Sequence, residues 1–498
     1  MKVELTDLVA LGPLWVILGT GLALLLLEVF SSGKDRSWGA YLAVFGSAIA
    51  LVMTVGAISE PARGLFVGKT GVAALRTDAL GQFASLVVIG AGLLTCLMSP
   101  GYVERARCAS GEYYALILFA VSGMIVMVMS TDLITMFLGL EIMSIAVYVL
   151  AGLRRNDPRS PEASLKYFLM GAFATGFLLF GIAFTFGATQ SVSYDRIATF
   201  AKSPLSEQRM LLFGIVLLLI GFGFKIAAVP FHVWAPDVYE GAPTPITGFM
   251  AVGVKAAAFV ALVRVVGSAL SPGGASANAE WVELLRVLAV LTILGGNIMA
   301  AVQRNVKRML AYSSISHAGY ALIGVVAVAL GKAEGGSALV FYLGAYAFMT
   351  LGAFGVLAFL ERKEGGPEAE RFGAFSGIGY QHPAIGLAMT IFMAALAGMP
   401  PTGGFVGKLY LFKAALAAGE TGLVIVGVVG SVISVYYYLR VVVAFYMREV
   451  PDPGPLPSPN QSRPAMLGVG LAAVGILMLG AFPSRVVELA KLAVSTFG

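Results

Sequence analysis

The sequence is divided into about fourteen apolar runs, most of them close to 20 residues long, separated by short charged or Pro/Gly-rich segments. A helix rises 1.5 Å per residue, so a run of this length spans the roughly 30 Å hydrocarbon core of a bilayer. Only 12% of the 498 residues are charged, against roughly 25% in an ordinary soluble domain. The pattern excludes a cytosolic enzyme and predicts an all-α, polytopic membrane protein of about 14 transmembrane helices.

The predicted spans group into four regions. We place three helices in 1–112, helices 4–8 in 113–270, helices 9–13 in 284–447, and a Pro-rich linker with the last helix in 448–498. The individual spans lie near 9–30, 38–58, 78–98, 113–130, 132–152, 164–188, 210–229, 244–268, 284–303, 310–330, 336–360, 383–418, 422–447 and 465–483.

Two of these spans are predicted to be broken. The run 383–418 is about 36 residues long, too long for one straight crossing, and contains Pro400 and Pro401 between glycines. The seventh run ends at Pro230 but continues as an apolar, interrupted stretch to Pro236. The breaks are about 170 residues apart, and each lies in the fourth span of a block of five. Paired interrupted helices in two halves predict two structural repeats and a transport path near the membrane midplane.

Five ionisable residues lie well inside predicted spans: Glu141, Lys225, Lys255, His317 and Lys408. A charge near the bilayer centre costs several kcal/mol even on lenient scales, so each requires an explanation. A single lysine near a helix end can extend to the headgroups. That explanation does not account for five such residues, two of them beside helix breaks. We therefore favour a row of protonatable groups inside the bundle.

The chemistry of these residue types suits proton transfer. Removal from water favours the neutral forms of both lysine and glutamic acid, and a nearby carboxylate restores the charged lysine. Glu141 near Lys225 would keep that lysine protonated, and a relay through Lys255, His317 and Lys408 would pass the proton onward. Nearby hydroxyls could hold intervening waters, although they could equally serve helix packing: these are Thr244, Thr247, Ser313, Ser314 and Ser316.

Other features narrow the function. The net charge of +6 is spread over many loops without a basic run, which disfavours a nucleic-acid partner. Cys96 and Cys108 are too few to ligate an iron–sulfur cluster, and no metal site or nucleotide-binding loop is predicted. Lysine and arginine are more frequent in the loops on one side, which favours both termini outside. By default, Arg264 is expected to extend to the interface and Trp234 to anchor there.

Three stretches resemble the antiporter-like membrane subunits of respiratory complex I, the proton-translocating NADH–quinone oxidoreductase. They are residues 225–245, 307–320 and 398–408, and with Glu141 they cover most of predicted spans 4–13. The segment Tyr239-Glu240-Gly241-Ala242-Pro243 looks most like the subunit N branch of this family. Lysine at position 408 argues against the subunit M branch, and the chain lacks the long C-terminal arm of the subunit L branch.

The resemblance implies two inverted five-helix repeats with broken helices 7 and 12. It also implies a role in moving protons with no cofactor in this chain, while partner subunits with FMN and iron–sulfur clusters pass electrons from NADH to quinone. By motif, Glu141 matches the family's fifth-helix glutamate, and Lys225, Lys255 and Lys408 match lysines of helices 7, 8 and 12. His317 lies in the tenth-helix region.

The expected partners are the other membrane and peripheral subunits, the lipid bilayer and a quinone bound elsewhere in the complex. The expected location is the bacterial inner membrane, with both termini on the periplasmic side. The main alternative is a subunit of a multisubunit sodium/proton antiporter, which shares the broken helices and lysines. A self-sufficient solute transporter and a purely structural membrane spacer are the remaining alternatives.

Overall fold

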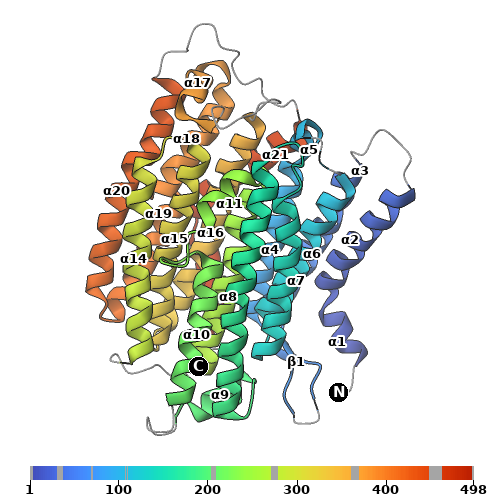
Figure 1. The fold of residues 1–498 in the computed structure, drawn as a ribbon, viewed down its shortest axis with the longest axis vertical. Coiled ribbons are helices and arrows are strands. Elements are labelled where there is room, and N and C mark those ends of the chain that lie inside the picture. Colours follow the sequence, from blue (N-terminus) through green and yellow to red (C-terminus); the bar gives the residue numbers. More distant parts are fainter. Residues whose placement is uncertain are drawn as a thin grey trace.

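The computed structural model describes residues 4–30, 38–68, 71–106, 108, 110–202, 209–270, 279–360, 370–447 and 462–495. In these ranges, 13 helices are long and apolar enough to cross a membrane, and they stand side by side in one bundle (Figure 1). The all-α, polytopic architecture is therefore confirmed. The Pro-rich linker between Pro451 and Pro459 lies outside the described residues.

The N-terminal region contains three crossing helices and a small hairpin. Its helices are α1 (Leu5–Ala10), α2 (Gly12–Phe30), α3 (Trp38–Ala57), α4 (Ala79–Met98) and α5 (Pro100–Ala106). Strands β1 (Arg63–Leu65) and β2 (Leu75–Thr77) pair antiparallel, with Gly64 opposite Arg76. This hairpin was not predicted from the sequence, because strands of three residues are too short to show an alternating pattern.

The next five crossings include the first broken helix. The elements are α6 (Ser110–Met129), α7 (Leu133–Ala151), α8 (Arg159–Thr189), α9 (Tyr194–Phe200), α10 (Arg209–Ile226), α11 (Ala235–Gly241), α12 (Thr244–Phe249), η2 (Met250–Val254), α13 (Lys255–Arg264) and η3 (Val265–Leu270). The last four elements form one continuous crossing in which η2 and η3 are π-helical. Short π-helical segments within α-helices are frequent at functional sites.

The remaining crossings include the second broken helix. The elements are α14 (Glu280–Val302), α15 (Val306–Ala329), α16 (Ala333–Leu360), the 3₁₀ turn η5 (Phe372–Phe375), α17 (Ile378–Gln381), α18 (Pro383–Ala397), α19 (Gly403–Ala417), α20 (Thr421–Tyr446), α21 (Arg463–Ala481) and α22 (Ser484–Val494). Helices α18 and α19 are each too short to span a bilayer alone. Together they make the interrupted twelfth crossing, which brings the total to the fourteen predicted.

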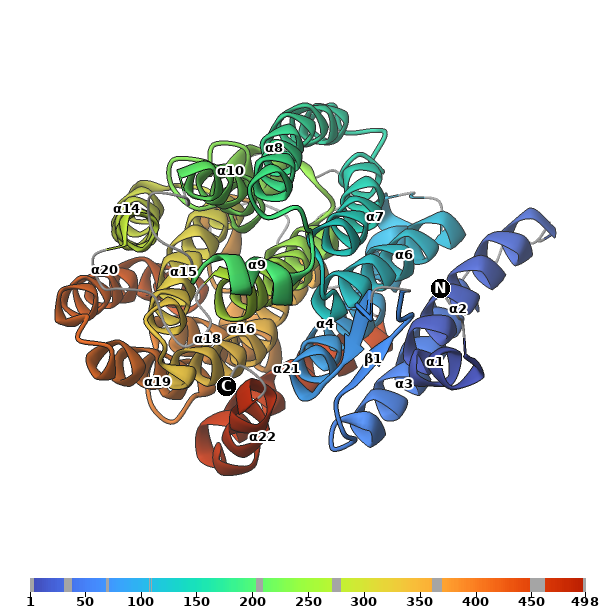
Figure 2. The same cartoon turned by 90° about the horizontal axis from the view of Figure 1, so that it is seen from below.

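The bundle has buried crossings in its interior and largely exposed crossings around them. The most apolar windows of α15 and of the crossing Thr244–Leu270 are fully buried, whereas those of α3, α8, α20 and α21 are only one third buried. Figure 2, seen from below, shows α16 enclosed by other helices, with α1, α9, α22 and the hairpin nearest the viewer. The first and last described helices therefore lie at the same end, called here the lower end because it is lowest in Figure 1.

Glycines permit close contact between α14 and α15. A Cβ on Gly296 of α14 would lie 2.5 Å from the backbone nitrogen of Ser316 on α15, and one on Gly319 would lie 2.6 Å from that of Ile293. Real Cβ atoms do not approach backbone so closely, so both positions require glycine. This contact fixes α15, which carries His317, against α14.

Candidate functional site

Side chains from outside α10 form hydrogen bonds with the backbone at the first helix break. Helix α10 ends at Ile226, and Ala227 takes a left-handed conformation with φ of 57°. The indole Nε1 of Trp234 donates to the carbonyl oxygen of Phe224 at 3.1 Å, and the backbone nitrogen of Val229 donates to Thr292 Oγ1 at 2.9 Å. The indole is thus a second donor to a carbonyl oxygen that also accepts from the backbone nitrogen of Ala227, whereas Thr292 gives the Val229 N–H a partner outside any helix. Trp234 is only 2% exposed, so the expectation that it anchors at the interface is wrong.

Lys225 lies in the last turn of α10, and its side chain is buried against α7. Its Nζ donates to Ser144 Oγ at 2.8 Å and to the hydroxyl of Tyr148 at 3.1 Å. The ammonium also lies over the rings of Tyr148 and Tyr167, 5.3 and 5.9 Å from their centroids. The lysine is thus held by neutral acceptors and aromatic faces rather than by a direct carboxylate contact.

Glu141 lies on α7 one turn before Ser144 and two turns before Tyr148. Its Oε1 accepts a hydrogen bond from Thr175 Oγ1 of α8 at 3.1 Å, and its side chain is only half-buried. Because residues at i, i+3 and i+7 share one helix face, the glutamate and the two partners of Lys225 lie along the same stripe of α7. The structure therefore brings Glu141 and Lys225 into one cluster without a direct ion pair.

Lys255 begins α13, directly after the π-helical segment η2. Its side chain is buried, and Nζ donates to both the carbonyl oxygen and the Oγ of Ser314 on α15, at 2.7 and 2.5 Å. The Tyr346 hydroxyl of α16 donates to the same Oγ at 2.9 Å. Ser314 is therefore the junction between helices α13, α15 and α16.

His317 lies three residues beyond Ser314 on α15 and is buried among tyrosines. Its Nδ1 lies 2.5 Å from the hydroxyl of Tyr342, and its Nε2 lies 2.9 Å from that of Tyr438. Tyr438 also shares a hydrogen bond with Ser313. Both ring nitrogens thus contact a group that can donate or accept a proton, which suits a histidine that passes protons in either direction.

Lys408 lies at the second break, where α18 ends at Ala397 and α19 begins five residues before the lysine. Its Nζ donates to the carbonyl oxygens of Leu396 and Ala397, each at 3.2 Å. These carbonyls are at the negative end of the α18 dipole, which favours a cation there. The ammonium also lies 4.8 Å from the ring centroid of Tyr320.

The predicted residues form two groups. The first contains Glu141 and Lys225, and the second contains Lys255, His317 and Lys408. In the second group, Lys255 connects through Ser314 to Tyr346, and the ring of His317 lies 5.2 Å from that of Tyr346. The ring of Tyr320 contacts both His317 and Lys408. Within the described ranges, no hydrogen bond joins Lys225 to Lys255.

The tyrosines of this site were not predicted from the sequence. Tyr148, Tyr342, Tyr346 and Tyr438 are all buried, yet each resembles an ordinary aromatic residue in an apolar span. Tyr148 had a detectable signal, because it lies seven residues after Glu141 and on the same helix face. The other three come from α16 and α20, and only the packing of those helices on α15 brings them to His317. Two of the hydroxyls considered as water-holding groups have direct side-chain partners instead: Ser314 accepts from Lys255, and Ser313 shares a hydrogen bond with Tyr438.

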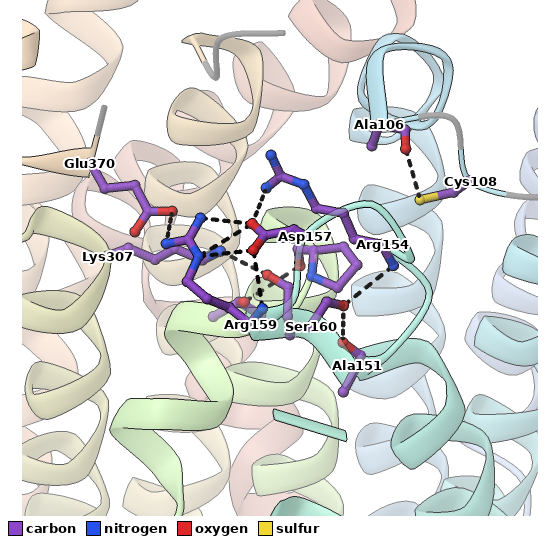
Figure 3. Close-up of polar contacts among 12 residues, drawn as sticks. Ala106, Cys108, Ala151, Arg154, Asp157, Arg159, Ser160, Lys307 and Glu370 are labelled. Atoms are coloured by element: carbon purple, nitrogen blue, oxygen red, sulfur yellow. Dashed lines mark hydrogen bonds and ion pairs between the residues drawn. The ribbon is translucent and has the colours of Figure 1, made fainter. Parts of the chain in front are cut away.

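A charged network covers the upper end of the bundle, where α7 meets α8. Asp157, in the loop between them, accepts hydrogen bonds from Arg159 and lies 3.7 Å from Arg154, while Arg159 also reaches Glu370 at 3.5 Å (Figure 3). Burial alone would raise the pKa of the Asp157 carboxyl, but hydrogen bonds and charge from Arg159 and Arg154 lower it below the usual 3.8. The Asp157 carboxyl is therefore ionised at neutral pH.

The charged network continues onto the broken helix. Arg308 of α15 contacts Asp237 and Glu240 of α11 at 2.9 and 2.8 Å. Lys166 of α8 reaches the same Asp237 at 3.3 Å. These ion pairs connect α11, the upper half of the broken crossing, to α8 and α15. In the described part of the chain, no cluster of three or more His, Cys, Asp or Glu residues could hold a metal ion.

Comparison with known proteins gives consistent matches. The family model described as NADH:quinone oxidoreductase/Mrp antiporter, TM matches residues 130–434. A Trichlorobacter lovleyi protein named NADH-quinone oxidoreductase subunit N is 44% identical over 475 residues, which are 95% of this chain and 94% of the relative. In the structure of respiratory complex I from Thermus thermophilus with bound aureothin, one chain is 34% identical with a TM-score of 0.79, over 96% of this chain and 99% of that one.

A more distant match has the same fold. In the Mrp complex from Dietzia sp., one chain has a TM-score of 0.83 over 97% of both chains, at 20% sequence identity. At this identity the likeness concerns the fold alone.

Proposed function

Because the chain belongs to the NADH:quinone oxidoreductase/Mrp antiporter family, and within it to the subunit N relatives of NADH–quinone oxidoreductase, we propose that it translocates protons within such a complex. Its partners are the other subunits of respiratory complex I. Flavin and iron–sulfur clusters are expected in those partners, which carry electrons from NADH to a quinone bound elsewhere. This chain supplies the path for protons and no redox centre.

The observation that carries the proposal is the set of four buried basic groups, Lys225, Lys255, His317 and Lys408, two of which lie beside helix breaks. Lys225 donates to neutral acceptors, so its charge is not fixed by a direct carboxylate, and Glu141 on the same stripe of α7 can alter its proton affinity. We propose that protonation or movement of Glu141 releases the proton of Lys225 towards Lys255. A water chain must carry the proton between the two groups, because no side chain bridges them in the described residues.

In the second group, side chains can carry the proton. Ser314 and the tyrosine hydroxyls around His317 can accept a proton on one side and donate on the other. Lys408 ends the row, where the α18 carbonyls stabilise its charged form. The site residues of the proposed relay are therefore Glu141, Lys225, Lys255, His317 and Lys408.

We also propose that the chain contains two inverted repeats, 113–270 and 284–447, flanked by 1–112 and 448–498. Each repeat has five crossings, and the broken one is the fourth in both, α10 with α11 and α18 with α19. We propose a bacterial inner-membrane location with both termini on the periplasmic side. Impermeant thiol reagents test this orientation on a Lys332→Cys variant, near the lower end, in which Cys108 is replaced by serine and Cys96 is buried: labelling from the periplasm only is expected.

The proton relay is tested in inverted membrane vesicles. Glu141→Ala and Lys225→Ala should each remove most NADH-driven acidification, measured by quenching of a pH-sensitive dye, while the amount of assembled complex stays normal. Glu60→Ala is the matched control, because this exposed glutamate, which follows α3, lies outside the row and outside the ion pairs around Asp237. Normal pumping and turnover in both variants would refute the relay.

The sodium/proton antiporter alternative makes a different prediction about partners. This alternative is supported by the fold that the chain shares with a chain of the Mrp complex. Purification of the tagged chain in mild detergent separates the two: flavin and iron–sulfur subunits co-purify with a complex I subunit. Isolation with antiporter subunits alone would favour the alternative.

A further inference from the structure

A cavity at the lower end of the bundle has no role in the proton relay. It has a volume of about 600 Å³ and lies between the start of α16, the end of α19 and helix α22. Its walls combine small and apolar side chains with two lysines, Lys413 and Lys491. We propose that this groove binds an anionic phospholipid, with the phosphate between the two lysines and an acyl chain along the apolar wall.

The depth of the groove matches the membrane interface. Helix α19 begins at Gly403 beside the break, and Lys413 follows ten residues later, which corresponds to about 15 Å along a helix. That distance is about half the hydrocarbon thickness of a bilayer. If the break is near the midplane, as paired broken helices usually are, Lys413 lies at the level of the phosphates.

The lining suits one acyl chain and one headgroup. Phe341 lies eight residues into α16, and Ala338 and Ala414 face the same cavity. The small alanine side chains leave room for an acyl chain, and the aromatic ring extends the apolar wall about 12 Å towards the bilayer centre. An apolar wall on the bilayer side of a cationic rim is complementary to a lipid and not to a soluble anion.

The charges at the rim favour an anionic headgroup. Lys413 and Lys491 are both exposed, and neither forms an ion pair with an acidic side chain in the described part of the chain. Glu334 also lines the cavity, from the first turn of α16. Two positive side chains against one negative leave the lining with a net positive charge.

Helix α22 forms the outer wall. It follows the last crossing, α21, after two residues, and it packs through Ala490, Ala493 and Val494, which are buried. Its charged residues, Arg485, Glu488 and Lys491, are exposed. A short helix with one apolar and one charged face is typical of helices that lie in the interfacial plane. A lipid in the groove would therefore tie α22 to the end of the broken helix α19.

The test uses the complex that contains the full chain, reconstituted in vesicles. A fluorophore on Ser337→Cys, which lines the groove, reports contact with brominated lipids by quenching; Cys108 is replaced by serine, and Cys96 is buried. Brominated phosphatidylglycerol should quench with about tenfold higher apparent affinity than brominated phosphatidylcholine, since each lysine near the surface attracts an anionic headgroup.

Variants locate the binding to the groove. Lys413→Ala with Lys491→Ala should abolish the preference for phosphatidylglycerol, whereas Glu334→Gln should increase it. Lys332→Ala is the matched control, because Lys332 lies at the same end of the bundle beside the groove but does not line it. Equal quenching by the two lipids in the complex that retains Lys413 and Lys491 would overturn the proposal. So would the absence of quenching by either, which would indicate water or a partner subunit in the groove.

Discussion

Arg264 and Asp78 form a bidentate ion pair in the interior, with both guanidinium nitrogens 2.7 Å from the carboxylate oxygens and side chains 4% and 0% exposed. Arg264 lies at the end of α13, and Asp78 caps the start of α4 by accepting from the backbone nitrogen of Gly81. The third guanidinium nitrogen, Nε, donates to the Val128 carbonyl oxygen. The pair therefore ties the N-terminal helices to the crossing that carries Lys255, and the expectation that Arg264 extends to the interface is wrong.

Breaking this pair should destabilise the bundle strongly. Asp78→Leu leaves the Arg264 charge buried without a counter-charge, which typically costs about 3–5 kcal/mol. We expect a large loss of assembled complex and a lower melting temperature of what remains. Combining Asp78→Leu with Arg264→Met removes both charges and should recover most of the loss, apart from about 1 kcal/mol for the lost helix cap. A double variant no better than the single would show that the pair is not the source of the effect.

The neutral partners of Lys225 give a second prediction. Tyr148→Phe removes one hydrogen bond to the ammonium while keeping the ring beside it, and a hydrogen bond to a charged group contributes about 1.5–3 kcal/mol. Proton pumping in vesicles should fall about tenfold, with NADH oxidation by an artificial electron acceptor unchanged. Tyr41→Phe, an exposed tyrosine on α3, serves as the control. Full pumping by Tyr148→Phe would mean that this hydroxyl does not set the proton affinity of Lys225.

Residue patterns were sufficient for the crossings, the breaks and the burial of the four basic residues, and insufficient for the side chains that contact those residues. Pro230 and Pro401 interrupt apolar runs, and Lys225 and Lys408 stand out because charges are rare in such runs. These are local signals. The contact between His317 and Tyr342 depends instead on how α16 packs on α15, and no local pattern encodes a contact between helices.

The same limit explains Arg264 and Trp234. Both residue types usually occur at membrane interfaces, so a sequence that shows no interior partner predicts an interfacial position for each. Asp78 is 186 residues from Arg264 in sequence, and nothing near either residue indicates the other. The indole of Trp234 donates to the carbonyl oxygen of Phe224, which also accepts from the backbone nitrogen of Ala227, and this contact is visible only once the break is built.

The loop ion pairs give a prediction about pH. The folded pKa of Asp157 is lowered, so its stabilising contribution is complete above its unfolded pKa of about 3.8 and is lost only as the pH falls through the still lower folded value. Asp157→Asn should therefore lower the melting temperature of the complex by the same amount at about pH 6 and about pH 9. A difference that shrinks towards pH 6 would show that Asp157 titrates near neutral pH and is not held by Arg159.

The second break gives the last prediction, because α21 covers it. A Cβ on Gly480 of α21 would overlap the carbonyl oxygen of Pro401, between α18 and α19. Overpacking of this kind typically costs about 1–3 kcal/mol, and backbone cannot move aside as a flexible side chain can. Gly480→Ala should therefore displace α21 or the break, which lowers the melting temperature and impairs pumping through the nearby Lys408. Gly470→Ala on the same helix is the control, since a Cβ there would meet no neighbouring atom of the described residues within 4 Å. Equal behaviour of the two variants would show that contact with α21 does not hold the break in place.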